Sequence, residues 1–517
     1  MLNYTITQAK IPLRLHLLFA VMGLVGVAII LIATSNFGAG LTPDSIGYLA
    51  ATRSLLAGKG VLWYNGDPID IWPPLYPVML AIVNKVFGVD FLASVHVINA
   101  IFFGLIVYLS GILFFNYLVS VPSLAILGSI YVLLSNSLFS VSVMAWSEPV
   151  FILCVLLFIL SIDAYLEKGD RIYFVILTLS AMLACLTRYI GVTLIISGIA
   201  SILILGKTSL RNKLTFSSIF AFISAFPLGL WLIRNYLVGG TIAGYREPSK
   251  YTVFDNISFT LEAIIRWFLP GRLVSLLSGH YLLGIISVGF VGLLCILLIS
   301  YSSKLTLDIN RLVPIALFTT IYLAFLIYTA TKIAFEQIEN RYVSPVFIII
   351  VLMGLLLIET LGEVLKKTVK LPSQTIKRFI NIAFATLLLL PLSSTIVNLN
   401  YWRTEGGGGY NSKIWRESQT IAYLRNQPLQ KQDKIYSNDP YALYLYTDII
   451  AKTVGYIKRE ISSFKGSESN STKAYLIWFH DSHPGYFDTP DELQSIVNVS
   501  PVTQLGDGTI YTIQGKK

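Results

Sequence analysis

Residues 91–117 read FLASVHVINAIFFGLIVYLSGILFFNY, a run of 27 residues without Asp, Glu, Lys or Arg. A helix needs about 20 mostly apolar residues to cross the hydrocarbon core of a bilayer, so this run is long enough to span a membrane. The rest of the chain has the same character: 55% of its 517 residues are hydrophobic and 13% are charged. Soluble domains carry about 25% charged residues, and so little charge does not cover several soluble cores. The sequence therefore predicts an all-α polytopic membrane protein.

Further apolar runs lie on both sides of this stretch, and the charged residues collect between them. We predict eleven transmembrane spans, within a range of ten to twelve. They are 15–34, 91–117, 122–142, 148–166, 172–187, 192–206, 214–233, 279–301, 312–330, 342–362 and 379–398. The fifth and sixth are short, and Thr187-Arg188-Tyr189 between them is either a tight turn or a break in one helix.

The loops on alternating sides differ in their content of Lys and Arg. With a cytoplasmic N-terminus, the short inner segments hold 14 Lys and Arg in 56 residues, and the outer segments hold 11 in 121. Positive residues concentrate on the cytoplasmic side of membrane proteins. We therefore expect a multi-pass protein of the cytoplasmic (inner) membrane, with its N-terminus inside and residues 399–517 on the periplasmic or extracellular side.

Composition changes after residue 398. The outer tail opens with Gly406-Gly407-Gly408-Gly409, which is typical of a flexible linker. A helical pattern at 412–426, strand-like runs at 434–437 and 474–479, and a hairpin about Gly506-Asp507-Gly508 follow. We predict a transmembrane catalytic domain over 1–398 and a small α/β domain over 399–517.

The net charge of +10 is compatible with nucleic acid or with anionic lipid, and the apolar composition favours lipid. We expect membrane lipids as partners and no nucleic acid. His480-Asp481-Ser482-His483 has metal-ligand residue types at loose spacing, which favours a solvated loop. No metal site is predicted, although a divalent metal is left open.

Charged and aromatic residues from separate segments fall at the predicted outer helix ends. The first outer loop contributes a helix that starts near Asp44 and stops at Gly58, and a second apolar segment from Trp72 to Gly88 that fits an interfacial helix. Asp44 is either an N-cap of its helix or a working acid. Glu148 is either a first-turn acid that meets the helix dipole or a functional group. Asp67 and Asp70 flank Pro68 as turn acids.

The order of these motifs resembles a known superfamily. An Asp and a Tyr four residues later follow the first span (Asp44, Tyr48), and Trp-Pro-Pro-Leu-Tyr-Pro (72–77) precedes the interfacial helix. Ser-Glu-Pro (147–149), Thr-Arg-Tyr (187–189) and Asn-Arg-Tyr (340–342) come after them. Together they resemble the GT-C superfamily of integral-membrane glycosyltransferases, and within it the bacterial family related to protein O-mannosyltransferases and aminoarabinose transferases.

The resemblance implies an inverting glycosyltransferase that moves a sugar from a polyprenyl-phosphate donor to an acceptor at the outer face. It places Asp44 as the general base that takes the proton of the acceptor hydroxyl. Glu148 is the other predicted catalytic residue, with the role of orienting the acceptor or contacting the sugar. Many relatives carry a further acid directly after this Asp, whereas Ser45 stands here. That departure argues against a paired-acid role in the first loop.

The departing lipid phosphate needs cations aimed at it. The expected donor phosphate-binding residues are Arg188, Arg341, Arg234 and Arg246, each of which can instead be an arginine at the level of the lipid headgroups. The expected substrate-binding residues are Tyr48, Tyr76, Tyr189, Tyr245, Glu339 and Tyr342. The enzyme would be a hexosyl- or pentosyltransferase whose acceptor is protein, lipid or glycan. The alternatives are a lipid-linked glycan transporter or flippase, and a glycan polymerase or ligase.

Overall fold

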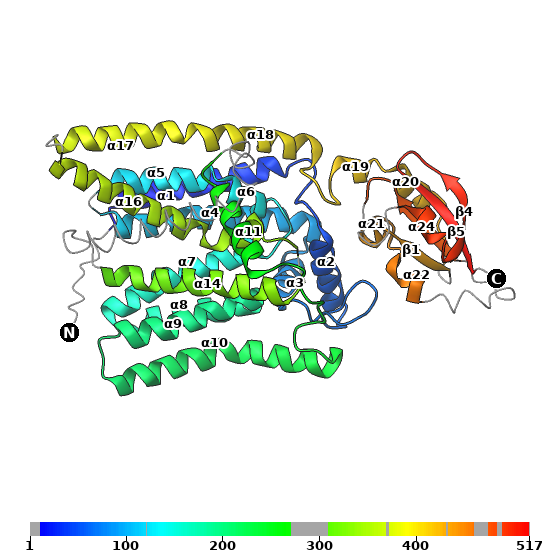
Figure 1. Ribbon diagram of the computed structural model, residues 1–517, viewed down its shortest axis with the longest axis horizontal. Coiled ribbons are helices and arrows are strands. Elements are labelled where there is room, and N and C mark those ends of the chain that lie inside the picture. The colour runs from blue at the N-terminus through cyan, green and yellow to red at the C-terminus, as the bar shows by residue number, and fades with distance from the viewer. Residues whose placement is uncertain are drawn as a thin grey trace. The chain divides into compact units, whose positions relative to one another are not determined.

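The computed structural model describes residues 11–119, 121–269, 309–334, 336–368, 372–430, 433–459, 474–482 and 489–515 (Figure 1). The chain forms two compact units. Unit 1 comprises Met1–Ser35 and Pro68–Arg403, and unit 2 comprises Asn36–Asp67 and Thr404–Lys517. Residues 36–67 therefore group with the tail, although more than three hundred residues separate them in the sequence. The predicted domain boundary at residue 398 stays a prediction.

Unit 1 is helical. Its first half contains α1 (Leu13–Ala33), α3 (Leu75–Phe87), α4 (Phe91–Tyr117), α5 (Pro122–Leu133), α6 (Asn136–Ser142), α7 (Glu148–Lys168), α8 (Arg171–Thr187) and α9 (Val192–Leu205). The second half contains α10 (Leu210–Gly239), α11 (Val253–Ile265), α14 (Leu312–Lys332), α15 (Asn340–Val343), α16 (Phe347–Thr368), α17 (Ser373–Leu387) and α18 (Leu389–Glu405). Short 3₁₀ turns occur at η1 (Tyr189–Gly191), η2 (Ile309–Arg311) and η3 (Ser344–Val346).

Seven helical segments among the described residues are long and apolar enough to cross a membrane. They are Leu13–Ala33, Phe91–Tyr117, Glu148–Lys168, Leu210–Gly239, Leu312–Lys332, Asn340–Glu363 and Gln374–Glu405. The predicted span 122–142 is a pair of helices, α5 and α6, bent by 45°. The predicted spans 172–187 and 192–206 are shorter helices, α8 and α9, and 279–301 lies outside the described residues. The multi-pass character is confirmed, while the count of eleven stays a prediction.

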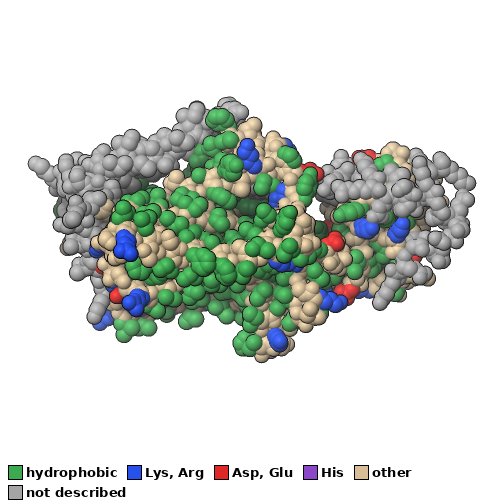
Figure 2. Space-filling view, turned by 90° about the horizontal axis from the view of Figure 1, so that it is seen from below, with side chains coloured by type: hydrophobic (Ala, Val, Ile, Leu, Met, Phe, Trp, Pro, Cys, Tyr) green, Lys and Arg blue, Asp and Glu red, His purple; other side chains and the backbone are tan. Residues whose placement is uncertain are grey.

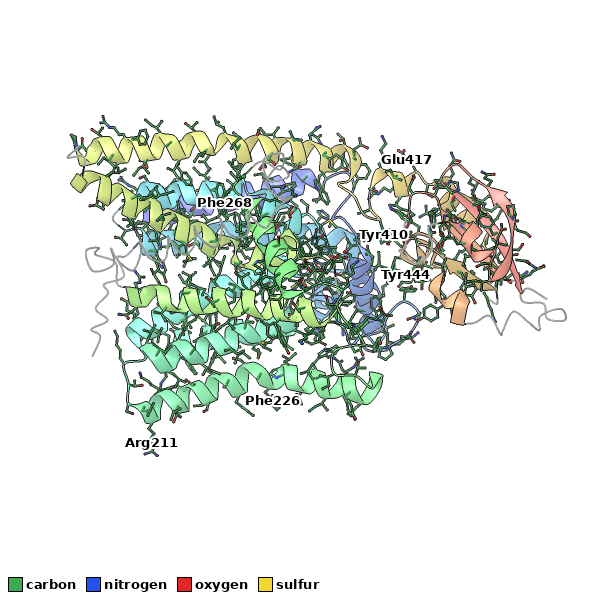
Figure 3. All side chains as sticks on the ribbon, viewed as in Figure 1. Arg211, Phe226, Phe268, Tyr410, Glu417 and Tyr444 are labelled. Carbon is green, nitrogen blue, oxygen red and sulfur yellow. The ribbon has the colours of Figure 1, made fainter. Side chains whose placement is uncertain are left out.

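The outer surface of the bundle is apolar. On α10, Phe222, Phe226 and Leu237 are 67%, 49% and 76% exposed. Phe226 lies on the outer side of this helix (Figure 3), and hydrophobic side chains cover much of the face that includes it (Figure 2). Side chains of this kind on a surface are stable in contact with lipid tails and unfavourable in water.

Inside the bundle, glycines let helices approach closely. A Cβ on Gly23 of α1 would lie 2.7 Å from the carbonyl oxygen of Gly104 on α4, so neither position accommodates a side chain. Small residues at helix crossings are the usual way in which membrane helices gain packing contacts. The α8–α9 junction is a turn, because η1 reverses the chain and the two helices lie side by side (Figure 1). This decides the alternative left open at Thr187-Arg188-Tyr189.

Unit 2 is built on a five-stranded sheet of order β2-β1-β3-β5-β4. Its strands are β1 (Lys434–Ser437), β2 (Lys452–Thr453), β3 (Ala474–Phe479), β4 (Val497–Gln504) and β5 (Gly508–Gly515). β1 is parallel to β2 and β3, whereas β5 is antiparallel to β3 and β4. The β4–β5 connection is the predicted hairpin at residues 506–508.

Helices cover the sheet of unit 2 on both faces. They are α19 (Lys413–Arg416), α20 (Gln419–Asn426), α21 (Pro440–Thr447), α22 (Gly455–Arg459) and α24 (Pro490–Leu493), while α2 (Pro43–Leu56) contacts α21. Alternate residues of β3 enter two cores, because Leu476 and Trp478 pack with Tyr436 while Ile477 and Phe479 pack with Leu443. Both faces of the sheet are thus buried, which makes the small α/β unit self-contained.

Candidate functional site

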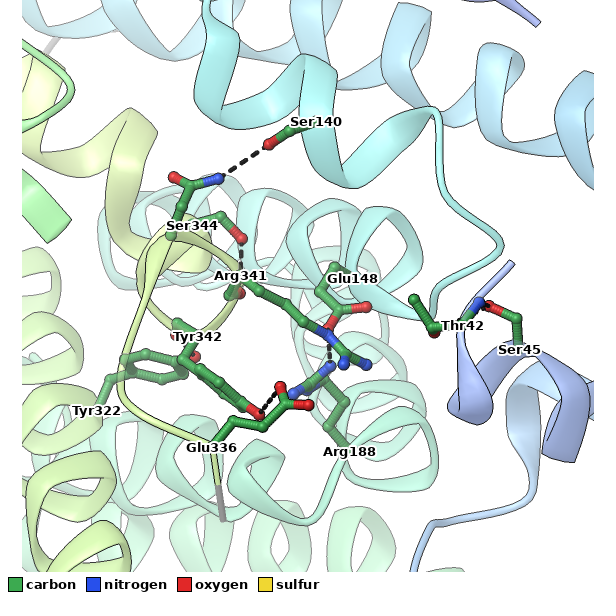
Figure 4. A network of polar contacts seen from close by, with 11 residues as sticks. Thr42, Ser45, Ser140, Glu148, Arg188, Tyr322, Glu336, Arg341, Tyr342 and Ser344 are labelled. Atoms are coloured by element: carbon green, nitrogen blue, oxygen red, sulfur yellow. Dashed lines mark hydrogen bonds and ion pairs between the residues drawn. The ribbon is translucent and has the colours of Figure 1, made fainter. Parts of the chain in front are cut away.

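Glu148 is the first residue of α7, after Ser147 and before Pro149, a position where proline is well tolerated. Its side chain is completely buried. The Oε1 atom accepts hydrogen bonds from Nη1 of Arg188 and from Nε of Arg341, the latter at 2.5 Å (Figure 4). Three predicted site residues from three separate elements therefore meet at one carboxylate. We call Glu148, Arg188 and Arg341 the cation cluster.

Local backbone structure positions both arginines. Arg188 ends α8 in an extended conformation (φ −148°, ψ 138°), directly before η1, so its side chain leaves the helix axis. Arg341 lies in the four-residue helix α15, and its guanidinium stands 4.3 Å from the centroid of the Trp146 ring. Arginine stacks on aromatic faces while its N–H groups stay available for anions.

The neighbouring residue Asn340 fixes α15. Its Oδ1 atom accepts from the Ser137 hydroxyl at 2.6 Å and from the Trp267 indole at 2.8 Å, and its Nδ2 donates to the Ser137 carbonyl and the Ser140 hydroxyl. The Tyr322 hydroxyl donates to the carbonyl of Tyr342 at 2.7 Å. A fully bonded amide of this kind holds the short helix, and therefore Arg341, in place.

The cation cluster suits an anion. Two guanidinium groups share one carboxylate, so the three side chains carry a net positive charge. Arg341 is 8% exposed, and the Arg188 side chain is 19% exposed. The Glu148 Oε2 atom has no hydrogen-bond partner among the described residues. Charge-assisted hydrogen bonds from arginine are strong and match the oxygen geometry of phosphate.

The other two predicted phosphate-binding arginines, Arg234 and Arg246, contact backbone carbonyls of residues 69–71 rather than Glu148. Arg234 donates to the carbonyl of Ile69 at 2.7 Å, and Arg246 donates to the carbonyl of Ile71 at 3.2 Å. Between them, the Tyr189 hydroxyl donates to the carbonyl of Asp70 at 2.7 Å. These three side chains hold residues 69–71, which precede α3. Their role toward the donor phosphate stays a prediction.

The remaining predicted residues of unit 1 differ in exposure. Tyr76 is buried, with 1% of its surface exposed, whereas Tyr245 is 81% exposed. The Tyr342 hydroxyl donates to Glu336 at 3.2 Å. Glu339 is exposed at the start of α15, where partial desolvation and the Glu336 carboxylate raise its pKa. Their contacts with substrate stay predictions.

In unit 2, Thr42 rather than Asp44 is the N-cap of α2, and Asp44 lies in the first turn. The N-cap alternative for Asp44 is therefore wrong, because Pro43 already occupies the first helical position. The Ser45 hydroxyl accepts from the backbone N–H of Thr42 at 3.1 Å (Figure 4). Ser45 thus serves the helix start, which gives a structural reason for its presence after Asp44. Tyr48 is buried on the same helix.

Trp146 and Asn340 support the cluster and were not among the predicted residues. Trp146 directly precedes the Ser-Glu-Pro motif, and Asn340 is the first residue of the Asn-Arg-Tyr motif. That proximity is the signal that was available in the sequence. Among the described residues, no group of three His, Cys, Asp or Glu side chains has the geometry for a metal ion.

The arrangement of the chain is shared with solved structures. ArnT from Cupriavidus metallidurans in the apo state superposes with a TM-score of 0.58 at 12% identity, over 96% of this chain and 97% of that one. The same protein bound to undecaprenyl phosphate gives a TM-score of 0.57 at 13% identity, over the same shares of both chains. Arabinofuranosyltransferase AftD from mycobacteria gives a TM-score of 0.52 at 13% identity, over 99% of this chain and 41% of that one.

No family model matches the chain, and no curated protein matches it by sequence. The likeness is therefore one of fold, at identities too low to carry an activity across. Within that limit the resemblance expected from the motifs is confirmed, since these structures are GT-C membrane glycosyltransferases. The chain shares the fold of these solved structures, and its C-terminal part contains a small sheet.

Proposed function

We propose that this protein is an inverting glycosyltransferase that moves a sugar from a polyprenyl-phosphate carrier to an acceptor hydroxyl. The cation cluster carries this proposal, because a buried carboxylate that aligns two guanidinium groups is suited to a phosphate. The ArnT structure with bound undecaprenyl phosphate supports a lipid phosphate as the donor group. The carrier would enter from the membrane, where the apolar bundle surface meets its chain.

In the proposed reaction the acceptor hydroxyl oxygen attacks the anomeric carbon of the donor. The bond between that carbon and the phosphate oxygen breaks, and the lipid phosphate leaves with the bonding electrons. Asp44 takes the proton of the acceptor hydroxyl, which contributes about 10²–10⁴-fold to the rate. Arg188 and Arg341 stabilise the negative charge that grows on the departing phosphate. That Asp44 faces these arginines stays a prediction.

Glu148 would act in this scheme as a positioning residue for the two arginines. Its Oε1 atom is already occupied by both guanidinium groups. A carboxylate in that state is a poor proton acceptor, because protonation would sacrifice two charge-assisted bonds. The unpartnered Oε2 atom remains available to a hydroxyl of the donor sugar. This differs from the sequence-based hypothesis that Glu148 is directly catalytic.

The test is transfer of label in phosphatidylcholine nanodiscs that contain the full chain. A panel of polyprenyl phosphates carrying radiolabelled hexoses or pentoses is incubated with extracts of the cell envelope as acceptor. We expect one label to leave the lipid fraction, and Asp44→Asn to reduce that transfer by at least about 10²-fold. The Asp448→Asn variant is the matched control, because Asp448 lies in the same unit with an 83% exposed side chain.

Two outcomes would contradict the proposal. Label that stays on the lipid phosphate in every reaction would remove the transferase, and movement of intact lipid-linked sugar between leaflets of liposomes would favour a flippase. Full transfer by Asp44→Asn would remove Asp44 from the mechanism. A product with many added sugar units would favour the polymerase alternative within the transferases.

The outer location is tested separately by labelling intact cells. Cysteine is introduced singly at Lys59, in the predicted first outer loop, and at Arg211, near the start of α10. Both positions are exposed. A maleimide that does not cross membranes should label the variant at Lys59 and leave the one at Arg211 unlabelled. The reverse pattern would place the proposed active side in the cytoplasm.

A further inference from the structure

Unit 2 contains a pocket of about 310 Å³ beside the start of α2. Its walls come from residues 41–43 of the first outer loop, from Tyr410 and Trp415, and from Asp439, Asp481 and Ser482. The size falls at the lower end of the range of small-molecule sites. All of these residues belong to the same compact unit, so the pocket is part of one folded body.

Asp439 is the unusual residue of this pocket. It follows β1 and precedes Pro440, and it is only 7% exposed. Its Oδ2 atom accepts from the Ser482 hydroxyl at 2.9 Å, while Oδ1 has no hydrogen-bond partner among the described residues. Burial raises the pKa of this carboxyl despite the nearby Tyr410 hydroxyl, Ser482 hydroxyl and Ala442 backbone N–H. A buried polar atom without a partner needs an explanation, and a bound ligand is one.

The aromatic wall of the pocket is rigid. The Trp415 and Tyr410 rings lie 5.5 Å apart between centroids at 62°, and Trp415 packs edge-on against Phe479 at 5.0 Å. The backbone carbonyl of Tyr410 accepts a hydrogen bond from the Tyr446 hydroxyl, which holds this residue in place. An apolar ring face beside a carboxylate suits a ligand that has C–H groups on one side and hydroxyls at its edge.

The charge of the pocket selects against phosphate. Asp439 and Asp481 are acidic, and none of the described lining residues is Lys or Arg. An anionic group would meet repulsion here, while hydroxyls can donate to the carboxylates. We propose that this pocket binds a neutral sugar unit of the acceptor, with Asp439 accepting from its hydroxyls and Trp415 and Tyr410 packing against its ring.

The chain connects this pocket to the residue proposed as the base. Thr42 and Pro43 line the pocket and directly precede Asp44. The segment is tied to the tail, because the backbone N–H of Tyr410 donates to the Leu41 carbonyl at 2.8 Å and Arg416 donates to the Phe37 carbonyl at 2.6 Å. A sugar in the pocket therefore lies against the element that carries Asp44. The acceptor assignment rests on the proposed function, whereas sugar binding does not.

The test is saturation-transfer NMR on the full chain in phosphatidylcholine nanodiscs, without detergents that carry sugar headgroups. The probes are methyl glycosides of glucose, galactose, mannose, N-acetylglucosamine and arabinose. We expect at least one to bind, Asp439→Asn to weaken it at least tenfold, and Asp448→Asn to leave it unchanged. Inorganic phosphate at the same concentration should not compete.

Three results would overturn the inference: no glycoside binds the unaltered chain, Asp439→Asn binds as well as the unaltered chain, or phosphate displaces the glycoside. If Asp439→Asn does not fold, Tyr410→Leu, which removes one of the two rings that pack against the sugar, is judged by the same criterion of weaker binding. Asp44→Asn separates the two proposals, because it should lose transfer and keep glycoside binding. Glycoside binding without any transfer by the unaltered chain would keep the pocket and reject the transferase.

Discussion

The cation cluster in unit 1 and the Asp439 pocket in unit 2 are built on the same motif, a buried carboxylate with one unpartnered oxygen. They differ in what the other oxygen receives. Two guanidinium groups donate to Glu148, whereas only neutral groups, such as the Ser482 hydroxyl, act on Asp439. The first arrangement leaves positive charge over and suits a phosphate, and the second leaves an acidic site that suits hydroxyls. Neighbouring charge, rather than the acid itself, therefore decides the class of ligand.

Removing Arg341 should have the largest effect, and the effect should be confined to the cation cluster. In Arg341→Gln the cluster loses its surplus positive charge, so we expect kcat/KM for the lipid-linked donor to fall about 10²–10³-fold, the range seen when one transition-state donor is removed. Glycoside binding to unit 2 should not change. Transfer kinetics at varied donor concentration and the NMR titration measure the two effects.

Arg266→Gln serves as the control for this variant, because the exposed Arg266, at the C-terminal end of α11, pairs with Glu262 four residues earlier. Its kinetics should match those of the unaltered chain. Arg341→Lys should fall between the two, since lysine keeps the charge and loses the planar fork that stacks on Trp146. Unchanged donor use in Arg341→Gln would exclude the cluster as the phosphate site.

Glu148→Gln tests the other half of the cluster. It leaves two guanidinium groups without their shared carboxylate, and breaking a buried ion pair in this way costs about 3–5 kcal/mol of stability. We expect a lower melting temperature and a raised KM for the donor. In Glu148→Gln the KM for the donor should rise more than kcat falls, whereas Asp44→Asn should lower kcat. A fall in kcat in Glu148→Gln as deep as that in Asp44→Asn would make Glu148 the base.

Gly409→Ala tests whether the first outer loop must stay on the tail. Gly409 has φ +75°, and a Cβ there would lie 2.2 Å from the Leu41 carbonyl oxygen. The clash should push residues 36–43 away, weaken glycoside binding and destabilise unit 2 by about 2–3 kcal/mol, more than backbone strain alone.

Gly408→Ala is the matched control. Gly408 also has a positive φ, of +95°, but a Cβ there meets nothing within 4 Å. Gly408→Ala should therefore lose stability through backbone strain without displacing Leu41, and it should keep glycoside binding. Equal loss of binding in both variants would show that the glycine conformation matters and the contact with Leu41 does not.

The elements that follow from local pattern were predictable. The run at 91–117 coincides with α4, and Gly506-Asp507-Gly508 forms the expected hairpin, because apolar length and turn residues act over short distances. The bend between α5 and α6 was not predicted, since the apolar run continues through it. The four glycines at 406–409 read as a flexible linker, yet all adopt positive φ and one approaches Leu41 closely.

The pairing of site residues was not predictable from spacing. Arg188 and Arg341 lie 40 and 193 positions from Glu148, and each could be placed only at a helix end. Their convergence depends on how α7, η1 and α15 pack. Asp439 was not predicted either, because its burial and the pocket that it lines together with residues 41–43 depend on segments far apart in the sequence.

The smallest expected effect concerns Asp507, an acid of unit 2 whose hydrogen bonds are structural. Asp507 accepts from the hydroxyls of Ser418 and Thr420 and from the Thr420 backbone N–H at 3.0 Å. Burial raises its pKa, but these hydrogen bonds outweigh burial and lower the pKa overall. A lowered carboxyl pKa stabilises the fold above the unfolded value of about 4 and loses that contribution as pH falls through the folded value. Asp507 is partly exposed, so solvent screening keeps this contribution small. Asp507→Asn should therefore lose less unfolding free energy on acidification than the unaltered chain, as measured by tryptophan fluorescence in urea. Asp448→Asn should keep the acid sensitivity of the unaltered chain. An unchanged pH profile in Asp507→Asn would assign that sensitivity to another group. That group is not Asp439, because the raised pKa of Asp439 gives the opposite sign.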